Sequence, residues 1–440
     1  MANHSSRSGV IGGIVIAAAI GIMNLTTYGL TLASARVLGP DQFGQFSSVL
    51  GALIVVNVLS LALQATGARR VSTAPCDLHS IERTILRTTA VGAACVVVIT
   101  LASAPLLATG LRLDSVMSAV AMSVAAGFLT LMGGQAGILQ GEQRWLPLAS
   151  VYAAMGVARL ASGGIALMIH QSAAAVLAGV AVGAAIPVIV GALALRHPSR
   201  STGRPPVGAE PVDSWRTFEQ GGIPREVAHS AHALLAFFAV SNIDVLLARG
   251  LLPPDPAGYY ASGLVLTKAL LFLPQFVVIV LFPSMARSHG GRRTHVLGLV
   301  AIAGIGVVAA AAVAAMSGLA LAFVGGAAYA PIEESLWLFA TLGTVLAMIQ
   351  LLVYSALAQR HPRAVVSLWL ALVATVAAAP LAQSAQDLML IKLGIDSLLL
   401  LMLGLHLLVF TPGEGPDAPP TPVSPPLAED SSSPEQPAVR

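Results

Sequence analysis

Long apolar runs, separated by short segments rich in Arg, Gly and Pro, recur along the whole chain. Apolar runs of about 18 residues or more are typical of helices that cross a membrane. Outer-membrane strands would instead show an alternation over roughly ten residues, which this chain lacks. The pattern predicts twelve transmembrane helices, at residues 10–35, 45–66, 88–108, 115–138, 147–169, 172–195, 226–249, 257–284, 295–324, 334–358, 364–383 and 387–410. The expected fold class is therefore all-α and integral to a membrane.

A turn between the first two runs returns in the middle of the chain. Ala35–Phe46 reads ARVLGPDQFGQF, and Ala248–Tyr260 reads ARGLLPPDPAGYY. With one inserted residue in the second copy, the pairs that correspond are Arg36 and Arg249, Pro40 and Pro254, Asp41 and Asp255, Gly44 and Gly258, and Phe46 and Tyr260. Each copy lies between two apolar runs, as the turn of a helical hairpin does. The alternative is a chance match between short turns, but the flanking pattern repeats as well, which favours two similar halves.

Four segments follow from this repeat. Residues 1–195 and 226–410 form two six-helix bundles, 196–225 is a cytoplasmic linker rich in Pro, Gly, Ser and Arg, and 411–440 is a disordered cytoplasmic tail. Halves with six helices each begin on the same side of the membrane, so they are parallel repeats related by an axis along the membrane normal. That arrangement predicts a central cavity between the bundles and is typical of transporters that work by alternating access.

Arginine in the loops predicts the orientation. With the N-terminus inside, seventeen arginines fall in inner segments: Arg7, Arg69, Arg70, Arg83, Arg87, Arg144, Arg196, Arg200, Arg204, Arg216, Arg225, Arg287, Arg292, Arg293, Arg360, Arg363 and Arg440. Only Arg36, Arg112 and Arg249 fall in outer loops. This asymmetry predicts a multi-pass protein of the cell membrane with both termini in the cytoplasm.

Composition narrows the class of protein further. The 440 residues are 56% hydrophobic and 10% charged, with a net charge of +3, whereas soluble domains average about 25% charged residues. The positive charge lies in short loops and not on one face, so nucleic acid is not an expected partner. Cys76 and Cys95 show no metal-ligand spacing. The sequence contains no cofactor motif and no nucleotide-binding P-loop.

Charged residues within the apolar runs are the candidate site residues, because each needs a partner or a watery cavity. Arg159, Lys268 and Lys392 are expected to line a cavity that accepts an anion. Asp244 and Asp396 are expected either to bind a coupling ion or proton or to form structural pairs. Asp396 follows Lys392 by four residues, so these two can pair on one helix face. For Arg159 and Lys268 the alternative is a structural pair with Asp244 or with backbone carbonyls.

Three stretches resemble the polysaccharide (O-antigen-type) flippases of the multidrug/oligosaccharidyl-lipid/polysaccharide exporter superfamily. They are Ala35–Phe46 with the helix up to Gln64–Ser72, then Asn242–Tyr260, and Ser262–Ala286 with Lys268, Leu273-Pro274 and Phe282-Pro283. The loop after the second helix, Gly67–Ser72, lacks the acid and the second glycine of the major facilitator pattern.

This resemblance implies a flippase that moves a lipid-linked oligosaccharide on undecaprenyl pyrophosphate from the inner to the outer leaflet. It also implies polysaccharide polymerases or glycosyltransferases as functional partners. Two alternatives remain: a secondary transporter of another solute, such as a drug/ion antiporter, and a membrane polysaccharide polymerase or ligase. An enzyme is disfavoured because the outer loops are short and the histidines are scattered.

Overall fold

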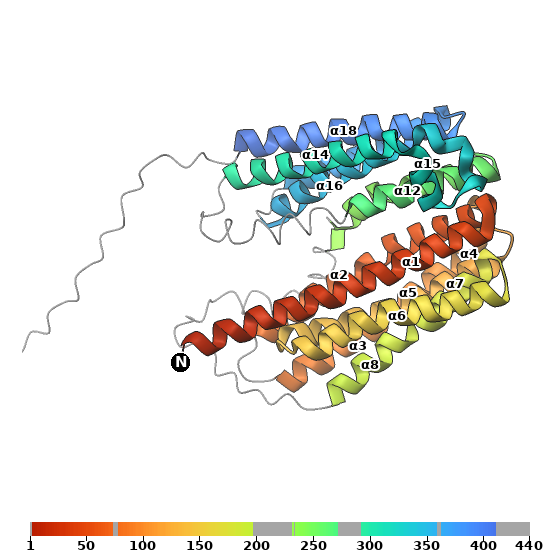
Figure 1. The fold of residues 1–440 in the computed structure, drawn as a ribbon. Coiled ribbons are helices and arrows are strands. Elements are labelled where there is room, and N and C mark those ends of the chain that lie inside the picture. Colours follow the sequence, from red (N-terminus) through yellow and green to blue (C-terminus); the bar gives the residue numbers. More distant parts are fainter. Residues whose placement is uncertain are drawn as a thin grey trace, which may run out of the picture.

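A computed structural model describes residues 2–73, 78–196, 231–232, 234–271, 292–358 and 362–410 of this chain. In these ranges the chain is helical, without strands (Figure 1). The N-terminal helices are α1 (Ala2–Val56), α2 (Val58–Thr73), α3 (Leu78–Ala102), α4 (Ala104–Gly110), α5 (Val116–Gly141), α6 (Trp145–Ile169), α7 (Ala173–Gly183) and α8 (Ala185–Arg196). The C-terminal helices are α11 (Ile243–Leu251), α12 (Pro254–Leu270), α14 (Arg292–Ala315), α15 (Ser317–Val324), α16 (Leu336–Ala358), α17 (Pro362–Ala378) and α18 (Ala385–Phe410). Two 3₁₀ segments, η1 (Ala327–Ser335) and η2 (Ala379–Leu381), connect some of them.

The all-helical membrane class is confirmed, whereas the predicted number of twelve spans is not. Among the described residues, nine helices are long and apolar enough to cross a membrane, or ten if the bent pair Leu234–Val240 and Ile243–Leu251 is one span. The first of the nine, Gly12–Ser72, has 61 residues, whereas one crossing needs about 20. Twelve helices in two repeated bundles therefore stay a prediction. The linker and the tail lie outside the described residues.

The first predicted turn is shorter than expected. α1 consists of two helical segments joined at a kink. Only Gly39 departs from helical geometry there, with φ 73° and ψ 172°, and the next residue is Pro40. A positive φ favours glycine, and proline suits the first position of the helix that follows. A single glycine followed by a proline therefore redirects the chain where the sequence suggested a loop.

Helices also extend beyond the apolar runs. The third helix begins at Leu78, ten residues before the predicted start at residue 88. Its first turns are amphipathic, and Ile85 is only 2% exposed in a small cluster with Val71 and Ile138. An apolar run marks the part of a helix that lies in lipid, but packing against a neighbour keeps the helix going into polar sequence.

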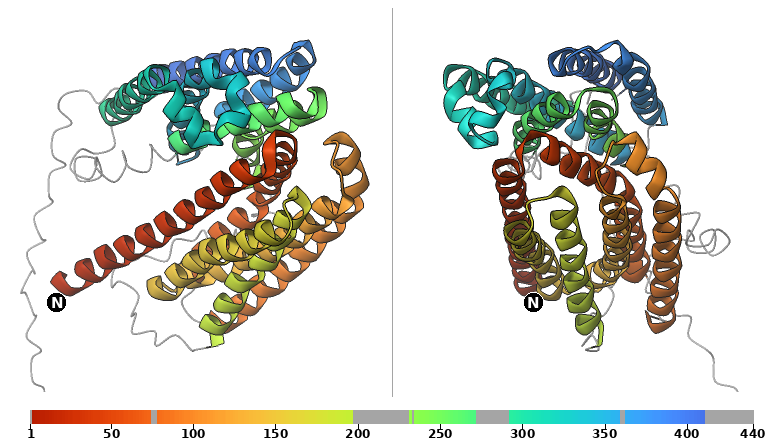
Figure 2. Two further views of the ribbon diagram at one scale, coloured as in Figure 1. Left: turned by 45° about the vertical axis from the view of Figure 1, so that its right-hand side comes forward. Right: turned by 90° about the vertical axis from the view of Figure 1, so that its right-hand side faces the viewer.

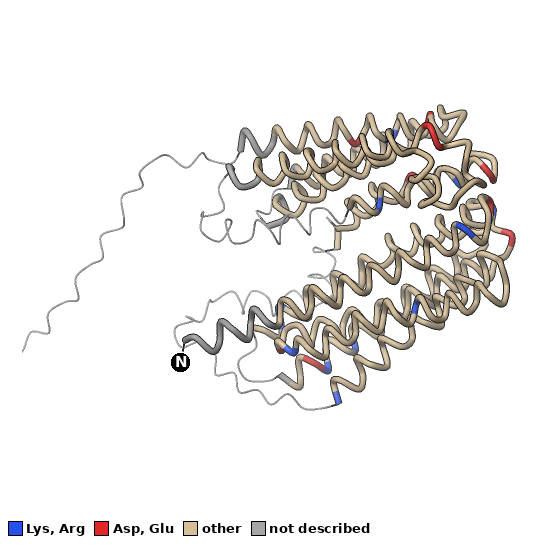
Figure 3. The backbone as a smooth tube through the Cα atoms, in the orientation of Figure 1, with Lys and Arg blue, Asp and Glu red and all other residues tan. Residues whose placement is uncertain are grey.

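The helices form two groups that meet at one end. Helices α1–α8 lie on one side and α11–α18 on the other, and the groups approach each other at the end where α1 bends and where α11 and α12 join (Figures 1 and 2). We call this the closed end. Arg69 near the end of α2, Arg144 just before α6 and Arg196 at the end of α8 lie at the opposite, arginine-rich end. Charged residues gather at the two ends of the helices, with few between them (Figure 3).

Candidate functional site

The two copies of the repeated turn touch each other at the closed end. A Cβ added to Gly44 would lie 3.1 Å from the Cα of Gly258, and one added to Gly258 would lie 1.9 Å from the carbonyl oxygen of Pro40. The two glycines that correspond in the sequence thus face one another across the boundary between the groups. Only glycine leaves room for backbones to approach this closely.

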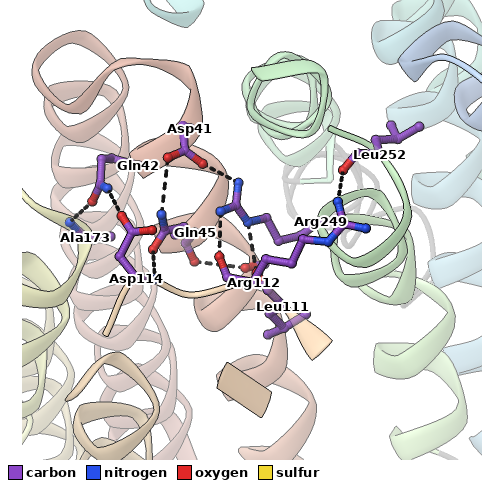
Figure 4. Close-up of polar contacts among 10 residues, drawn as sticks. Asp41, Gln42, Gln45, Leu111, Arg112, Asp114, Ala173, Arg249 and Leu252 are labelled. Carbon is purple, nitrogen blue, oxygen red and sulfur yellow. Dashed lines mark hydrogen bonds and ion pairs between the residues drawn. The ribbon is translucent and has the colours of Figure 1, made fainter. Parts of the chain in front are cut away.

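Arg249, on α11, is the charged centre of this contact (Figure 4). Its Nη1 lies 2.6 Å from Oδ1 of Asp41, on α1. Its Nε donates to the carbonyl of Leu111 at 2.9 Å, and its Nη2 donates to that of Arg112 at 2.8 Å. With 2% of its side chain exposed, Arg249 is buried and well satisfied, as a buried cation must be.

The other two arginines that the sequence predicted in outer loops also reach across the boundary. Arg112 donates from Nη1 to the carbonyl of Leu252 at 3.1 Å, and Arg36 donates from Nη2 to that of Ala322 at 3.0 Å. All three arginines that depart from the inner-loop bias therefore connect the two helix groups. The sequence alone showed only that these three were exceptions to that bias.

Amide side chains fix the acid that Arg249 binds. Gln45 accepts from the backbone N–H of Asp114 at 3.0 Å, and its Nε2 lies 3.4 Å from Oδ2 of Asp41. Gln42 hydrogen-bonds the carboxylate of Asp114 and accepts from the N–H of Ala173 at 2.9 Å (Figure 4). This network links α1 to the start of α5 and of α7, so Asp41 is held in place before Arg249 meets it.

Two tyrosines add contacts between the groups. The hydroxyl of Tyr329 donates to the carbonyl of Ala35 at 2.8 Å, and that of Tyr28 donates to the carbonyl of Val265 at 2.8 Å. The closed end thus combines glycine contact, charge and hydrogen bonding over several helical turns.

In the C-terminal group, α18 carries the ion pair that the spacing predicted. Lys392 and Asp396 pair one turn apart, and both are 0% exposed. The pairing expectation is thus met. The place of Lys392 in the anion site stays a prediction, and Arg159 and Lys268 are the cations of the spans without such a pair among the described residues.

Asp244 lies beside a break in the predicted seventh helix. The helix bends by 42° between Val240 and Ile243, and Asp244 is in the first turn after the break. Its Oδ2 accepts from the hydroxyl of Tyr260 at 3.1 Å, and its Oδ1 accepts from the N–H of Val245 at 3.0 Å. A carboxylate in the first turn also interacts favourably with the helix dipole. Sequence reasoning missed this break, although Ser241 and Asn242, within an apolar run, are residue types that favour helix starts.

Lys268 lies in the last turn of α12, partly buried. It forms no hydrogen bond or ion pair with any residue that the structure describes, although Asp244 is near enough to interact with it electrostatically. Residues 272–291, with Pro274, lie outside the described ranges. Lys268 is thus a cation in a span without direct contact to an acid of the described chain.

Arg159 is the cation of the N-terminal group. It lies in the middle of α6, partly buried, with no ion pair or hydrogen bond to a described residue. Val157 and Met168 of the same helix are 52% and 86% exposed, which marks the lipid-facing side. At about 100° per residue, Arg159 lies roughly opposite both of them. Its guanidinium therefore points into the protein and not into lipid.

A family model described as polysaccharide biosynthesis protein matches residues 10–289. The match covers well over half of the chain. The chain belongs to the polysaccharide biosynthesis protein family. The family expected from the three sequence stretches is therefore confirmed. No curated protein matches this polysaccharide biosynthesis protein in sequence.

Solved structures share its fold. The inward closed conformation of lipid II flippase MurJ superposes with a TM-score of 0.66 at 9% identity, covering 89% of this chain and 86% of that one. An inward-facing multidrug resistance MATE family transporter of the MOP superfamily gives 0.62 at 12% identity, covering 88% and 93%. An outward-facing structure with the same description gives 0.54 at 12% identity, covering 90% and 94%. The polysaccharide biosynthesis protein therefore has a MATE/MurJ-like fold.

Proposed function

We propose that this polysaccharide biosynthesis protein is a flippase. Its substrate is an oligosaccharide carried on undecaprenyl pyrophosphate, which it moves from the inner to the outer leaflet by alternating access during surface polysaccharide synthesis. Family membership and the MATE/MurJ-like fold support transport of a membrane-bound substrate. Polymerases or glycosyltransferases of the same pathway would act before and after it.

The main observation behind this proposal is that Arg159 lies in a span without a charged or hydrogen-bonding partner among the described residues. A cation in a span is costly unless it has a partner, and Arg159 has none among the described residues. A pyrophosphate needs cations beside it to enter the hydrocarbon region, and guanidinium binds phosphate oxygens in a fixed, two-pronged geometry. Lys268 supplies a second positive charge from the other group.

The closed end supports alternating access. A transporter that loads its substrate from the inner leaflet must be shut on the outer side, and here the contacts lie at the end that the arginine count places outside. The fold is also more similar to the inward-facing MATE transporter than to the outward-facing one, with TM-scores of 0.62 and 0.54.

Asp244 is the candidate for coupling to a proton or sodium ion. Its carboxylate accepts two hydrogen bonds but lies in no ion pair among the described residues, whereas Asp396 already holds Lys392. We therefore assign Asp396 a structural role and retain Asp244 for coupling.

The test is a strain that lacks this gene, complemented with single variants. We expect the deletion strain to accumulate lipid-linked oligosaccharide in the inner leaflet and to lose surface polysaccharide. A hydrogen bond to a charged group contributes about 1.5–3 kcal/mol, and 1.4 kcal/mol corresponds to about tenfold in binding. Arg159→Ala, Lys268→Ala and Asp244→Asn should each lower surface polysaccharide at least tenfold at unchanged protein level, and Arg159→Lys should restore part of it.

The possible results separate the hypotheses. Normal polymer from both Arg159→Ala and Lys268→Ala would remove the anion site, and normal polymer from Asp244→Asn would make that residue structural. A deletion strain without accumulated lipid-linked oligosaccharide but with raised sensitivity to cationic drugs would favour the antiporter alternative. In the described N-terminal group, no acid lies in the middle of a span, which argues against a cationic substrate.

A further inference from the structure

Three polar side chains meet on the N-terminal group, although they come from three different helices. Nε2 of Gln64, on α2, donates to Oε1 of Gln140 on α5 at 2.9 Å and to the hydroxyl oxygen of Tyr152 on α6 at 2.6 Å. Gln140 is exposed, and the other two side chains are partly buried. We propose that Gln64, Gln140 and Tyr152 bind the saccharide of the substrate, next to Arg159, which binds its pyrophosphate. This inference rests on the proposed function and adds a specificity site to it.

The register of two helices places this cluster in line with Arg159. Tyr152 and Arg159 are seven residues apart on α6, so they share one face and lie about 10 Å apart along the helix. Asn57 lies at the break between α1 and α2, seven residues before Gln64, and α2 runs antiparallel to α6. Because Gln64 contacts Tyr152, Asn57 lies level with Arg159. Gln64 with Tyr152 and Asn57 with Arg159 thus form two polar layers, about two helical turns apart.

The packing of α6 directs this face toward the interior of the group. A Cβ added to Gly156 would meet Met23 of α1, and Ser162 contacts Gly183 of α7. Arg159 lies between these two contact faces on the helix, and its face is roughly opposite the exposed Val157. Arg159 and Tyr152 nevertheless remain partly accessible. Part of each side chain is therefore within reach of solvent on the side that faces away from lipid.

Hydrogen-bond capacity is left over in both layers. Gln64 uses both amide hydrogens on its two partners, which leaves its own Oε1, the amide group of Gln140 and the hydroxyl hydrogen of Tyr152 unused within the described chain. In the other layer, Oδ1 of Asn57 is buried without a partner among the described residues. An unmatched buried polar atom is costly unless a ligand or water satisfies it.

The chemistry fits a saccharide next to a pyrophosphate. Sugar rings present hydroxyls that both donate and accept, which suits amides, and an apolar face that packs on an aromatic ring such as that of Tyr152. The pyrophosphate at Arg159 and the cluster at Tyr152 are separated by about 10 Å along α6, so the first sugars would extend from the phosphate toward the arginine-rich end. Specificity for the first sugars would then come from this cluster, and affinity for the carrier from Arg159.

The test compares two probes on purified full-length protein in nanodiscs. One is undecaprenyl pyrophosphate without sugar, and the other is the undecaprenyl-pyrophosphate-linked saccharide fraction extracted from the deletion strain. The variants are Tyr152→Phe, which removes only the hydroxyl, and Gln64→Met, which keeps the side-chain volume. The matched control is Tyr354→Phe, because Tyr354 accepts from Gln350 at 3.2 Å in the same kind of pair in the C-terminal group.

We expect Tyr152→Phe and Gln64→Met each to weaken binding of the saccharide-bearing probe about tenfold, while their affinity for bare undecaprenyl pyrophosphate stays within twofold of wild type. Arg159→Ala should weaken both probes, and Tyr354→Phe neither. Variants that bind both probes as wild type does, or that lose both equally while remaining monodisperse, would overturn the saccharide assignment. A wild-type protein that binds neither probe would instead overturn the proposed function.

Discussion

The charged side chains of the spans differ in whether they have found a partner. Lys392 and Asp396 are both fully buried and neutralise each other within one helix. Arg159 and Lys268 keep some exposure and touch no acid among the described residues. A buried pair contributes structure, whereas an unpaired cation in a span is stable only where water or an anion reaches it. This difference sets Lys392 apart from Arg159 and Lys268.

Replacing one residue of the Lys392–Asp396 pair should destabilise the protein, whereas replacing both with apolar residues should not. Replacing one partner of a buried pair typically costs about 3–5 kcal/mol because the other charge is left alone, whereas replacing both with apolar residues is often neutral. We expect Lys392→Met to lower the thermal unfolding temperature in detergent strongly, and Lys392→Met with Asp396→Leu to recover most of the loss. A double variant as unstable as the sum of the single variants would show that the two residues act independently.

The ends and breaks of the helices follow from tertiary contacts as much as from hydropathy. α3 begins ten residues before the apolar run because Ile85 finds a packing partner. The seventh predicted helix bends at Asn242, next to Asp244. Between the two arms of α1, a single glycine with positive φ replaces the expected loop. The repeated turns are thus short enough for Gly44 and Gly258 to reach each other.

Gly258→Ala tests the contact between the repeated turns. In a helix, alanine is ordinarily favoured over glycine by about 1 kcal/mol, but here the new Cβ would lie 1.9 Å from the carbonyl oxygen of Pro40. Overpacking of this kind costs about 1–3 kcal/mol, which should favour separation of the two groups at the closed end. The readout is the labelling rate of Ala257→Cys, a neighbour that is 1% exposed, with Cys76 and Cys95 replaced by Ser.

We expect labelling to be about tenfold faster in Gly258→Ala, since 1.4 kcal/mol corresponds to a factor of ten. Gly29→Ala is the matched control on α1, where an added Cβ meets no atom within 4 Å. Equal labelling rates in the two variants would contradict a close contact at Gly258.

On the scale of the whole molecule, the arginine-rich end and the closed end, where the two helix groups touch, lie opposite each other. Among the described residues, most arginines lie at the helix ends opposite the closed end, and the three at the closed end bind across the boundary between the helix groups. Because those three are engaged in contacts, their presence on the predicted outer side is explained by packing. It does not contradict the rule that places arginine inside.

Thiol labelling of intact cells tests this orientation. Ser72→Cys and Gln386→Cys place exposed thiols at the arginine-rich and the closed end, in protein whose native cysteines are replaced by Ser. We expect a membrane-impermeant maleimide to label Gln386→Cys in intact cells and Ser72→Cys only after permeabilisation. The reverse pattern would invert the topology and place the closed contacts on the cytoplasmic side.

The sequence alone determined the features that depend on local spacing. Apolar runs gave the membrane class, the loop arginines predicted an orientation, and a spacing of four residues gave the Lys392–Asp396 pair. The family was also readable from the motifs. Only the tertiary structure decided which charges stay unpaired and which distant residues meet, such as Gln64 with Tyr152 and Asp41 with Arg249. The reason is physical: hydropathy locates a helix along the chain, whereas packing sets its rotation and its bends, and these decide what each side chain touches.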